Sequence, residues 1–291
     1  MKKGLLVTNT FLNTEKFSEL NEMFKAGAEK YGGSLFVKTG ADVWSLIANR
    51  DYKKSDDYDF VLFWDKDVKL AKELEDEGYR VMNPSEGIAD CDDKARTYLK
   101  LVHHGIPQPK TMCSPLKYFA DGIIDKGFLD EAVKMFGFPL VIKECFGSFG
   151  QQVYLAGDME EAEKIITGIG EKPYILQEFI TDAKGRDARL QVVGGKVVAA
   201  MGRRNDNDFR ANITNGGVME KYETSKEEEN LAVKVCEILN LDFAGVDILT
   251  DKSGKKYICE VNSNAHFKNL FDCTGVNVAE EIIKYAMLDN I

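Results

Sequence analysis

The sequence lacks several features that would assign it quickly to a functional class. It has only three histidines and no H-x-x-x-H motif or Cys/His cluster, so a zinc site is not expected. Its six cysteines include no C-x-x-C pair, which favours reduced thiols in a cytoplasmic protein over a disulfide framework. No apolar stretch approaches the roughly 18 residues of a membrane span, and the apolar run after the basic start is too short for a signal peptide. A membrane protein is therefore not expected.

The chain also lacks an excess of basic residues. Its 38 lysines and arginines are outnumbered by 48 aspartates and glutamates, which gives a formal net charge of −10. A general nucleic-acid-binding protein needs a basic surface, so this class is not expected either. The remaining composition is that of a globular protein, with 44% hydrophobic residues, and a length of 291 residues suggests about two domains.

The first part of the chain alternates strand and helix patterns. Short apolar runs predict strands at residues 4–8, 34–40 and 58–65, and amphipathic segments predict helices at 14–33 and 67–79. Such alternation is typical of βαβ units in a parallel sheet. The turn after the first strand has no G-x-G-x-x-G motif, so a standard dinucleotide-binding fold is not expected.

From about residue 91 the pattern changes to that of an α+β module. A helix is expected at 91–105, followed by a proline-containing connector. Two strands, at 139–145 and 153–156, flank a short glycine-containing loop and are expected to form an antiparallel hairpin. Helices are expected around 128–137 and at 158–170, and a strand at 174–180. The remaining strands, at 188–195, 196–204, 243–250 and 255–263, are expected around a helix at 226–240.

The first motif that suggests chemistry is VIKECFGSFGQQV, residues 141–153. Lys143 lies on the predicted strand, and Gly147, Ser148 and Gly150 follow in the turn. Glycines let backbone N–H groups approach a phosphate closely, and a lysine adds a positive charge. The motif is not a Walker loop, and an ordinary hairpin with two glycines is the alternative.

A second motif, LQEFITDAKGRDARLQVV, covers residues 176–193. Gln177 and Glu178 end an apolar strand, and Asp187 and Arg189 begin another. A linker between two lobes could present backbone N–H and C=O groups to the edge of an adenine ring. An ordinary polar loop between strands is the alternative interpretation.

The third motif, residues 202–217, places three arginines among aspartates, asparagines and glycines at the end of a hydrophobic strand. Arg203, Arg204 and Arg210 are suited to phosphates and carboxylates, because a guanidinium group can bind either through two parallel hydrogen bonds. The alternative is a solvated run of charges.

The fourth feature is a set of acidic residues on otherwise apolar strands. Asp247 lies in FAGVDIL, and Glu260 and Asn262 lie in CEVNSN, where alternation puts them on one face and Cys259 and Val261 on the packed face. Oxygen ligands from neighbouring strands suit Mg²⁺, which commonly binds one or two carboxylates together with substrate phosphates. A carboxylate paired with an arginine is the alternative.

Taken in order, these motifs resemble the ATP-grasp superfamily, and most closely its branch of RimK-type α-L-glutamate ligases. The resemblance runs from about residue 83 to the C-terminus, and the stretches DFRANITNGG and AGVDIL…EVNSN are specific to that branch. It implies an α/β and α+β architecture with an N-terminal parallel βα (pre-ATP-grasp) domain and two α+β lobes that clasp a nucleotide. The implied domains are residues 1–90, a central lobe at 91–176 with the glycine-rich loop, and a C-terminal lobe at 177–291 with the metal site.

The resemblance also implies a role for each candidate residue. The nucleotide-binding residues would be Lys94, Lys143, Gly147, Ser148, Gly150, Gln177, Glu178, Phe179, Ile180, Asp187 and Arg189, with residues 147–151 as a mobile loop over the phosphates. Asp247, Glu260 and Asn262 would hold one or two Mg²⁺ (or Mn²⁺) ions. Arg203, Arg210 and Asn212 would steady the γ-phosphate and an acyl phosphate.

The implied reaction is ligation of a carboxylate to an amine, driven by ATP through an acyl phosphate. Its substrates would be a small molecule, peptide or protein end and a glutamate-like amino acid, and the protein would form a homo-oligomer by analogy. Two alternatives remain: an ATP-grasp kinase that phosphorylates a hydroxyl group, and a catalytically silent nucleotide-binding regulatory protein.

One segment departs from the branch. Its members usually continue the metal strand as Asn-x-Ser-Pro-Gly, whereas this chain continues from Asn262 through Ser-Asn-Ala to His266. The changed loop borders the expected acceptor site, so the identity of the added amino acid is left open. We hypothesise that His266 or Lys268 contacts a substrate carboxylate. The alternative is that His266 caps the next helix.

Overall fold

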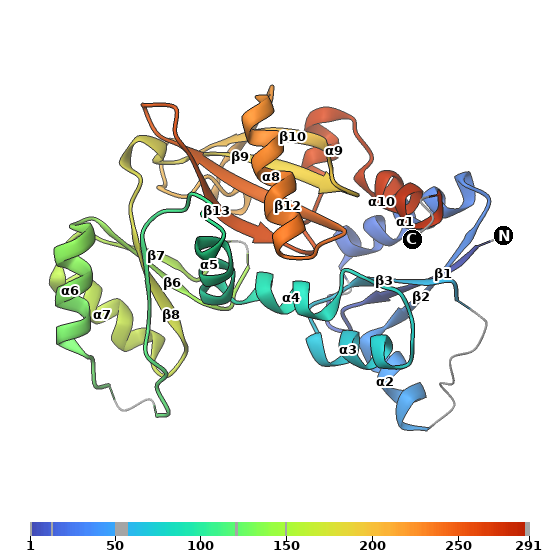
Figure 1. Cartoon of the computed structure of the whole chain (residues 1–291), viewed down its shortest axis with the longest axis horizontal. Coiled ribbons are helices and arrows are strands. Elements are labelled where there is room, and N and C mark those ends of the chain that lie inside the picture. Colours follow the sequence, from blue (N-terminus) through green and yellow to red (C-terminus); the bar gives the residue numbers. More distant parts are fainter. Residues whose placement is uncertain (1, 13, 50–57, 120–121, 149, 289–291) are drawn as a thin grey trace.

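The computed structural model describes residues 2–12, 14–49, 58–119, 122–148 and 150–288. The elements within these ranges form three sheets with helices packed against them (Figure 1). The N-terminal part contains β1 (Lys3–Thr8), α1 (Glu15–Lys30), β2 (Ser34–Thr39), α2 (Gly40–Ala48), β3 (Phe60–Trp64), α3 (Val68–Asp76), β4 (Val81–Met82) and α4 (Ser85–Asp92).

The N-terminal sheet is parallel, with strand order β2-β1-β3-β4, which confirms the predicted βαβ arrangement. Every residue of β3 is buried, as expected for a central strand with both faces covered. On one face, Val43 of α2 and Leu70 of α3 contribute to the core. On the other face, Phe24 of α1 packs in the same cluster as Ile282 near the C-terminus. The C-terminal segment therefore completes the N-terminal domain.

The central part forms a second, antiparallel sheet. It contains α5 (Lys94–His103), β5 (Thr111–Cys113), α6 (Lys126–Phe136), β6 (Leu140–Glu144), β7 (Val153–Ala156), α7 (Met159–Ile169) and β8 (Tyr174–Glu178). The strand order is β5-β8-β6-β7, and β6 and β7 pair antiparallel, which confirms the predicted hairpin. Leu129 of α6 and Ile166 of α7 lie in one core cluster with the strands, and both helices lie on one side of this sheet (Figure 1).

The helix predicted at residues 91–105 is interrupted in the structure. Residues of this range belong to the end of α4 and to α5, with Asp93 between them. The Asp93 side chain accepts hydrogen bonds from the backbone N–H groups of Ala95 and Arg96, so it acts as the N-cap of α5. This cap starts a new helix and fixes the orientation of Lys94 at its first position.

The C-terminal part forms the third sheet, again antiparallel. It contains η1 (Thr181–Ala183), β9 (Arg186–Val193), β10 (Lys196–Arg204), η2 (Ile213–Asn215), β11 (Val218–Lys221), α8 (Lys226–Ile238), β12 (Phe243–Thr250), β13 (Lys256–Asn262), α9 (Lys268–Thr274) and α10 (Val278–Leu288). The strand order is β11-β10-β9-β12-β13, and α8 packs on one face. A capping box between Ser225 and Glu228 begins α8. The elements α2, β5, β11, α9 and α10 had not been predicted.

An aromatic cluster joins the N-terminal and C-terminal sheets. Trp64 at the end of β3 stacks on Phe243 at the start of β12, with ring centroids 5.6 Å apart. Phe24 and Phe267 pack edge-on against the same tryptophan. Large buried aromatic rings contribute strongly to packing, so this contact fixes the end of β3 against the C-terminal lobe.

A buried asparagine makes a second connection between the two sheets. The Nδ2 group of Asn83 donates to the carbonyl oxygens of Phe243 (2.9 Å) and Ser263 (2.7 Å). Its Oδ1 atom accepts from the backbone N–H groups of Asp242 (2.7 Å) and Phe243 (3.1 Å). The loop that follows β13 is thereby tied to the end of β4.

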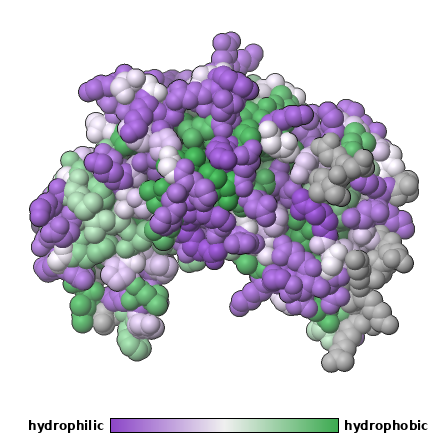
Figure 2. Space-filling model, in the orientation of Figure 1, coloured by the Kyte–Doolittle hydropathy of each residue, from purple (hydrophilic) through white to green (hydrophobic). Residues whose placement is uncertain are grey.

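Hydrophilic residues predominate on the face of the molecule seen in Figure 2, and the lower edge of that view is hollowed between the central lobe and the N-terminal sheet. The expected α/β and α+β fold with three sheets is confirmed. The domain boundaries after residues 90 and 176 remain predictions; the first falls within α4 and the second within β8.

Candidate functional site

Two adjoining pockets lie along β13. The first, here called the hinge pocket, lies between the central sheet and the C-terminal sheet. Twelve of the predicted site residues line it: Lys143, Gly150, Gln177, Glu178, Phe179, Ile180, Asp187, Arg203, Arg210, Asn212, Asp247 and Glu260. The motifs that are far apart in the sequence are thus brought together on one cleft.

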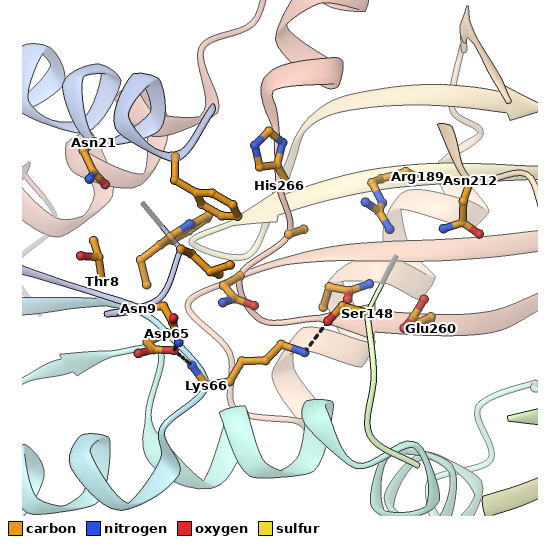
Figure 3. A pocket seen from close by; sticks show the side chains of 16 residues that line it. Thr8, Asn9, Asn21, Asp65, Lys66, Ser148, Arg189, Asn212, Glu260 and His266 are labelled. Atoms are coloured by element: carbon orange, nitrogen blue, oxygen red, sulfur yellow. Dashed lines mark hydrogen bonds between the residues drawn. The ribbon is translucent and has the colours of Figure 1, made fainter. Parts of the chain in front are cut away.

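The second pocket, here called the switch-point pocket, lies between the C-terminal sheet and the N-terminal sheet (Figure 3). Its lining includes the predicted residues Ser148, Arg189 and Asn262. Glu260 and Asn212 line both pockets, so the two cavities meet at these residues. Lys94 lies in a smaller recess that also borders Lys143 and Glu260, whereas Gly147 lines none of these three cavities.

The end of β8, which leads into the hinge, is held by the start of β5 and by the residue before it. The Gln177 Nε2 group donates to Thr111 Oγ1 at 2.9 Å, and the backbone N–H of Glu178 donates to the carbonyl oxygen of Lys110 at 2.9 Å. Phe179 packs edge-on against Phe209 with centroids 6.3 Å apart. An apolar wall and a fixed backbone edge are the features that a planar heterocycle needs.

A buried ionic network forms the floor between the strands of the C-terminal sheet. Arg189 binds Asp247 through two hydrogen bonds of 2.7 Å, and Arg203 binds Asp187 through bonds of 2.6 and 2.7 Å. Arg203 also lies 2.8 Å from Asp247. Burial opposes ionisation of Asp247, but the two arginines outweigh it and hold the pKa of that carboxyl below its usual value. The arginine pairing that the sequence left open is therefore present in this state.

The predicted metal ligands lie next to one another on paired strands. Asp247 of β12 is opposite Glu260 of β13 in the register, and Asn262 follows two residues later. The described residues contain no cluster of three or more His, Cys, Asp or Glu side chains suited to a metal. Two carboxylates and an amide form an oxygen-only donor set, which fits Mg²⁺ that is also bound by phosphates. Asp247 would have to exchange at least one arginine contact to bind the ion.

A β-bulge changes the predicted orientation of Cys259. Asp247 is opposite Glu260 and Ile248 is opposite Ile258, so Cys259 is the extra residue on β13. Ile258 and Val261 are buried in the core under α8, as expected for Val261. Cys259 instead lines the hinge pocket, and its Sγ atom lies 3.8 Å from Lys143 Nζ. The prediction that Cys259 faces the packed side was wrong, because the bulge breaks the alternation.

The glycine-containing loop is contacted from several elements. Lys94 Nζ lies 3.5 Å from the carbonyl oxygen of Gly147 and 3.9 Å from Glu260, and its burial lowers the pKa of Lys94. Arg210 Nη1 donates to the carbonyl oxygen of Gly150 at 2.7 Å. At Gly150, where φ is +72°, a Cβ atom would lie 2.8 Å from an Asn212 oxygen, so only glycine fits. Phe149, within the predicted loop, lies outside the described residues.

His266 lines the switch-point pocket, but it is held as a neutral side chain. Burial, together with nearby cations, lowers the pKa of His266 to about 3. The ring meets Phe17 edge-on at 5.9 Å, and its Nε2 atom has no hydrogen-bond partner within the described part of the chain. The N-cap of α9 is Phe267, with no side-chain capping bond, so the capping role considered for His266 is not observed.

Two other residues that the sequence suggested as ligand contacts form ion pairs outside both pockets. Lys268 forms an ion pair with Asp272 and lines neither pocket. Arg204 pairs with Asp206 and Glu220 and also lines neither. The contact of His266 or Lys268 with a substrate carboxylate stays a prediction.

Sequence reasoning missed the contribution of the N-terminal sheet. Thr8 and Asn9 at the end of β1, and Asp65 and Lys66 at the end of β3, line the switch-point pocket. Lys66 Nζ lies 2.5 Å from Asp92 and 3.4 Å from Ser148 Oγ, so it links this domain to the glycine loop (Figure 3). These residues could have been found from their position in the sequence, because each pair follows a predicted parallel strand and ligands bind outside the carboxyl ends of such strands.

Among the described helices, none combines the length and apolar character that crossing a membrane would require.

Comparisons with known proteins place this chain in a family. The RimK-like ATP-grasp domain matches residues 91–286. An uncharacterized protein of Mycoplasma genitalium is 33% identical over 98% of this chain and 99% of its own length. N-acetylaspartylglutamate synthase A of Homo sapiens is 32% identical over 77% of this chain, which spans 56% of that protein.

The fold is also that of a solved ligase. D-alanine–D-alanine ligase from Bacillus anthracis, in a structure with ATP, superposes with a TM-score of 0.74 at 18% identity, covering 97% of this chain and 96% of that one. The likeness at this identity concerns the fold alone. The matched domain covers most of the chain and includes β13, the strand along which both pockets lie. The chain belongs to the RimK-like ATP-grasp family of ligases.

Proposed function

We propose that this protein is an ATP- and Mg²⁺-dependent carboxylate–amine ligase that releases ADP and phosphate. The observation that carries the proposal is the meeting of the two pockets at Glu260 and Asn212. A nucleotide in the hinge pocket would extend its phosphates toward these residues. Substrates in the switch-point pocket would then reach the γ-phosphate without crossing open solvent.

The hinge pocket supplies the contacts that a nucleotide needs. Glu178, Phe179 and Ile180 would hold adenine, with Gln177 fixed behind them, and Asp187 would reach the ribose. Lys94, Lys143 and the loop at 147–151 would bind the phosphates. The burial of Lys143 and the low exposure of Lys94 strengthen their attraction for phosphate oxygens, since water screens them little.

Asp247, Glu260 and Asn262 would hold the magnesium, which neutralises phosphate charge and acts as a Lewis acid when bound. To bind magnesium, Asp247 would have to give up an arginine contact, and Arg203 can release it. Arg203 already pairs with Asp187, so it can keep a partner if its contact with Asp247 is exchanged. Arg210 would steady the γ-phosphate, and Asn212 would face it from the shared wall of the pockets.

The proposed reaction has two steps. A carboxylate oxygen of the first substrate attacks the γ-phosphorus of ATP; the bond to the β–γ bridging oxygen breaks, giving ADP and an acyl phosphate. The second substrate, an ammonium ion at neutral pH, loses one proton to solvent; its amine nitrogen then attacks the acyl carbon, phosphate leaves, and the nitrogen loses a second proton as the amide forms. Positioning and charge neutralisation would supply most of the rate, so no side-chain nucleophile is required.

The second substrate in this proposal is an amino acid of the glutamate type. The support is the 32% identity to a synthase whose name specifies a glutamate product. The first substrate is a small carboxylic acid or a peptide or protein end. The reaction would take place in the cytoplasm, consistent with six cysteines that are all free. Homo-oligomerisation stays a prediction.

A phosphate-release screen tests this function. ATP and Mg²⁺ are supplied with pairs of carboxylic acids and amino acids, and products are weighed by mass spectrometry. The ligase produces phosphate only when both substrates are present, and the product mass equals their sum minus water. Phosphorylated hydroxyl product without an amine requirement would identify a kinase, and ATP binding without turnover would identify a silent protein. Glu260→Gln is the inactive control, matched by Glu220→Gln at an exposed position on β11.

A further inference from the structure

The switch-point pocket occupies the position in the N-terminal sheet where ligands usually bind. The chain leaves β1 in one direction to form β2 and returns on the other side of β1 to form β3, so the strand order is β2-β1-β3-β4. A crevice opens outside the carboxyl ends of strands at such a reversal. Asn9 follows β1 and Asp65 follows β3, and both line the pocket.

Asp65 differs from the other buried acidic residues of the described chain. Besides Asp65, the buried acidic residues are Asp90, Glu144, Glu228, Asp242 and Asp247. Each of these five forms an ion pair with a lysine or arginine. Asp65 is only 7% exposed and has no such pair with any described residue. An ionised carboxylate with no countercharge is costly to bury, so its retention calls for a ligand.

The hydrogen bonds of Asp65 leave one oxygen for that ligand. Its Oδ1 atom accepts from Asn9 Nδ2 at 2.9 Å and from the backbone N–H of Lys66 at 2.7 Å. Both donors are neutral groups. No hydrogen bond joins Oδ2 to a residue in the described ranges, and this atom is not among the fully buried unpaired ones. The carboxylate is therefore oriented but not neutralised.

The neighbouring lysine does not supply the missing charge. Figure 3 shows the Lys66 side chain running away from Asp65 toward Ser148. Its ammonium group lies 2.5 Å from Asp92, which already provides its countercharge. Within the described residues, no lysine or arginine therefore neutralises Asp65.

We propose that Asp65 binds an ammonium group of the substrate that occupies the switch-point pocket. This proposal deepens the proposed ligase function. It rests on that function for one point, that the bound molecule is a substrate of the reaction. An ammonium group donates in three directions, and the hydroxyl of Thr8 and the side-chain oxygens of Asn21 and Asn264 also line the pocket as acceptors. A metal ion fits less well, because the only other carboxylate lining this pocket in the described part of the chain is Glu260, which is already assigned to the proposed magnesium site.

The proposal predicts an unusual response to Asp65→Asn. The substitution keeps the size of the side chain and its bond from Lys66 N–H, but removes a charge that has no partner. We expect the melting temperature to stay equal or rise. A merely structural carboxylate would show the opposite, because removing it would lower the melting temperature.

The pocket contains its own reporter of binding. Trp64 lines it, and the only other tryptophan, Trp44, lies on α2. In a Trp44→Phe background, fluorescence reports Trp64 alone. The twenty L-amino acids are titrated one by one without ATP, and each binder is compared with its desamino analogue; L-glutamate and glutarate form the first pair, since they differ only in the ammonium group.

We expect at least one amino acid to bind saturably, and its desamino analogue to bind about 10- to 100-fold more weakly, as for a hydrogen bond between charged groups. Asp65→Asn should abolish this difference while leaving the affinity for the analogue unchanged. Asp65→Glu, which keeps the charge, should restore part of it. The proposal is overturned if no amino acid binds, if Asp65→Asn keeps the difference, or if both ligands weaken equally.

This experiment is independent of turnover. Ammonium-dependent binding with no amine-dependent phosphate release would contradict the ligase function and leave the Asp65 site intact. Amine-dependent phosphate release whose KM for the amino acid is unaffected by Asp65→Asn would contradict the Asp65 site and leave the ligase function intact.

Discussion

The hinge pocket and the switch-point pocket share Glu260 and Asn212 but balance their charges differently. In the hinge pocket, Asp187 and Asp247 are neutralised by Arg189 and Arg203 before any ligand arrives. In the switch-point pocket, Asp65 is held by neutral donors only. The charges of the hinge pocket are therefore already in place to stabilise charge that develops during the proposed reaction. In the switch-point pocket, the proposed ligand itself supplies the missing positive charge.

The two pockets also differ in what holds them in place. The hinge pocket is built from the central and C-terminal sheets, which the hinge after β8 joins directly along the chain. The switch-point pocket is built from two sheets that are joined by the aromatic contact of Trp64 with Phe243 and by the hydrogen bonds of Asn83. Changes at the shared wall should therefore affect both pockets, and changes elsewhere should affect only one.

The largest expected effect is that of Glu260→Gln at the shared wall. The variant keeps the side-chain size but removes a carboxylate proposed to bind the metal, so kcat for amine-dependent phosphate release should fall about 10²- to 10³-fold. Steady-state kinetics at saturating ATP and Mg²⁺ measure this. If Glu260→Gln turned over as fast as the Glu220→Gln control, the assignment of Glu260 as a metal ligand would be wrong.

A smaller effect is expected for Arg210→Ala, which acts on the hinge pocket alone. This side chain contacts the carbonyl oxygen of Gly150 and is proposed to steady the γ-phosphate. Loss of a charged hydrogen bond should reduce kcat/KM for ATP by about 10- to 100-fold. The matched control is Arg204→Ala, because Arg204 pairs with Asp206 and Glu220 outside both pockets. Equal losses in the two variants would refute the role of Arg210.

The smallest expected effect is a dependence of the free energy of unfolding on pH, which arises from His266 in the switch-point pocket. Burial lowers the pKa of His266 to about 3, so the folded protein holds a neutral imidazole while the unfolded chain binds a proton below about pH 6.5. Stability should therefore be greatest above pH 6.5 and decrease as the pH falls toward 3.

Urea denaturation at pH 7 and pH 5 measures this effect. His266→Gln should lose about 1 kcal/mol less stability than the parent between these values, allowing for partial exposure of the ring. Identical losses in parent and variant would show that His266 is not the acid-sensitive group.

The sequence predicted the hinge pocket better than the switch-point pocket for a physical reason. Lys143, Asp247 and Glu260 are polar residues inside apolar strands, and such residues stand out locally. Asp65 and Lys66 follow a strand where polar residues are ordinary, and only the strand order reveals that β1 and β3 are neighbours with a reversal between them. Residue patterns do not contain that information.

Two local features were also beyond the reach of periodicity. The bulge at Cys259 depends on the register between β12 and β13, which is set by packing across the sheet. The arginine partners of Asp247 depend on the strand order β10-β9-β12, which brings Arg203 of β10 and Arg189 of β9 to the same carboxylate. The sequence left metal binding and arginine pairing of Asp247 as alternatives; the structure shows the arginine pairing, and metal binding stays a proposal.

The most direct test of the account follows the oxygen of the carboxylate substrate. With the carboxylic acid found by the screen labelled with ¹⁸O in its carboxyl group, the ligase mechanism transfers one labelled oxygen to the released phosphate. Mass spectrometry or ³¹P NMR of that phosphate should show one ¹⁸O atom per turnover, matched by its loss from the amide product. Phosphate that carries no ¹⁸O while amide accumulates would contradict the acyl phosphate, and with it the proposed ligase mechanism.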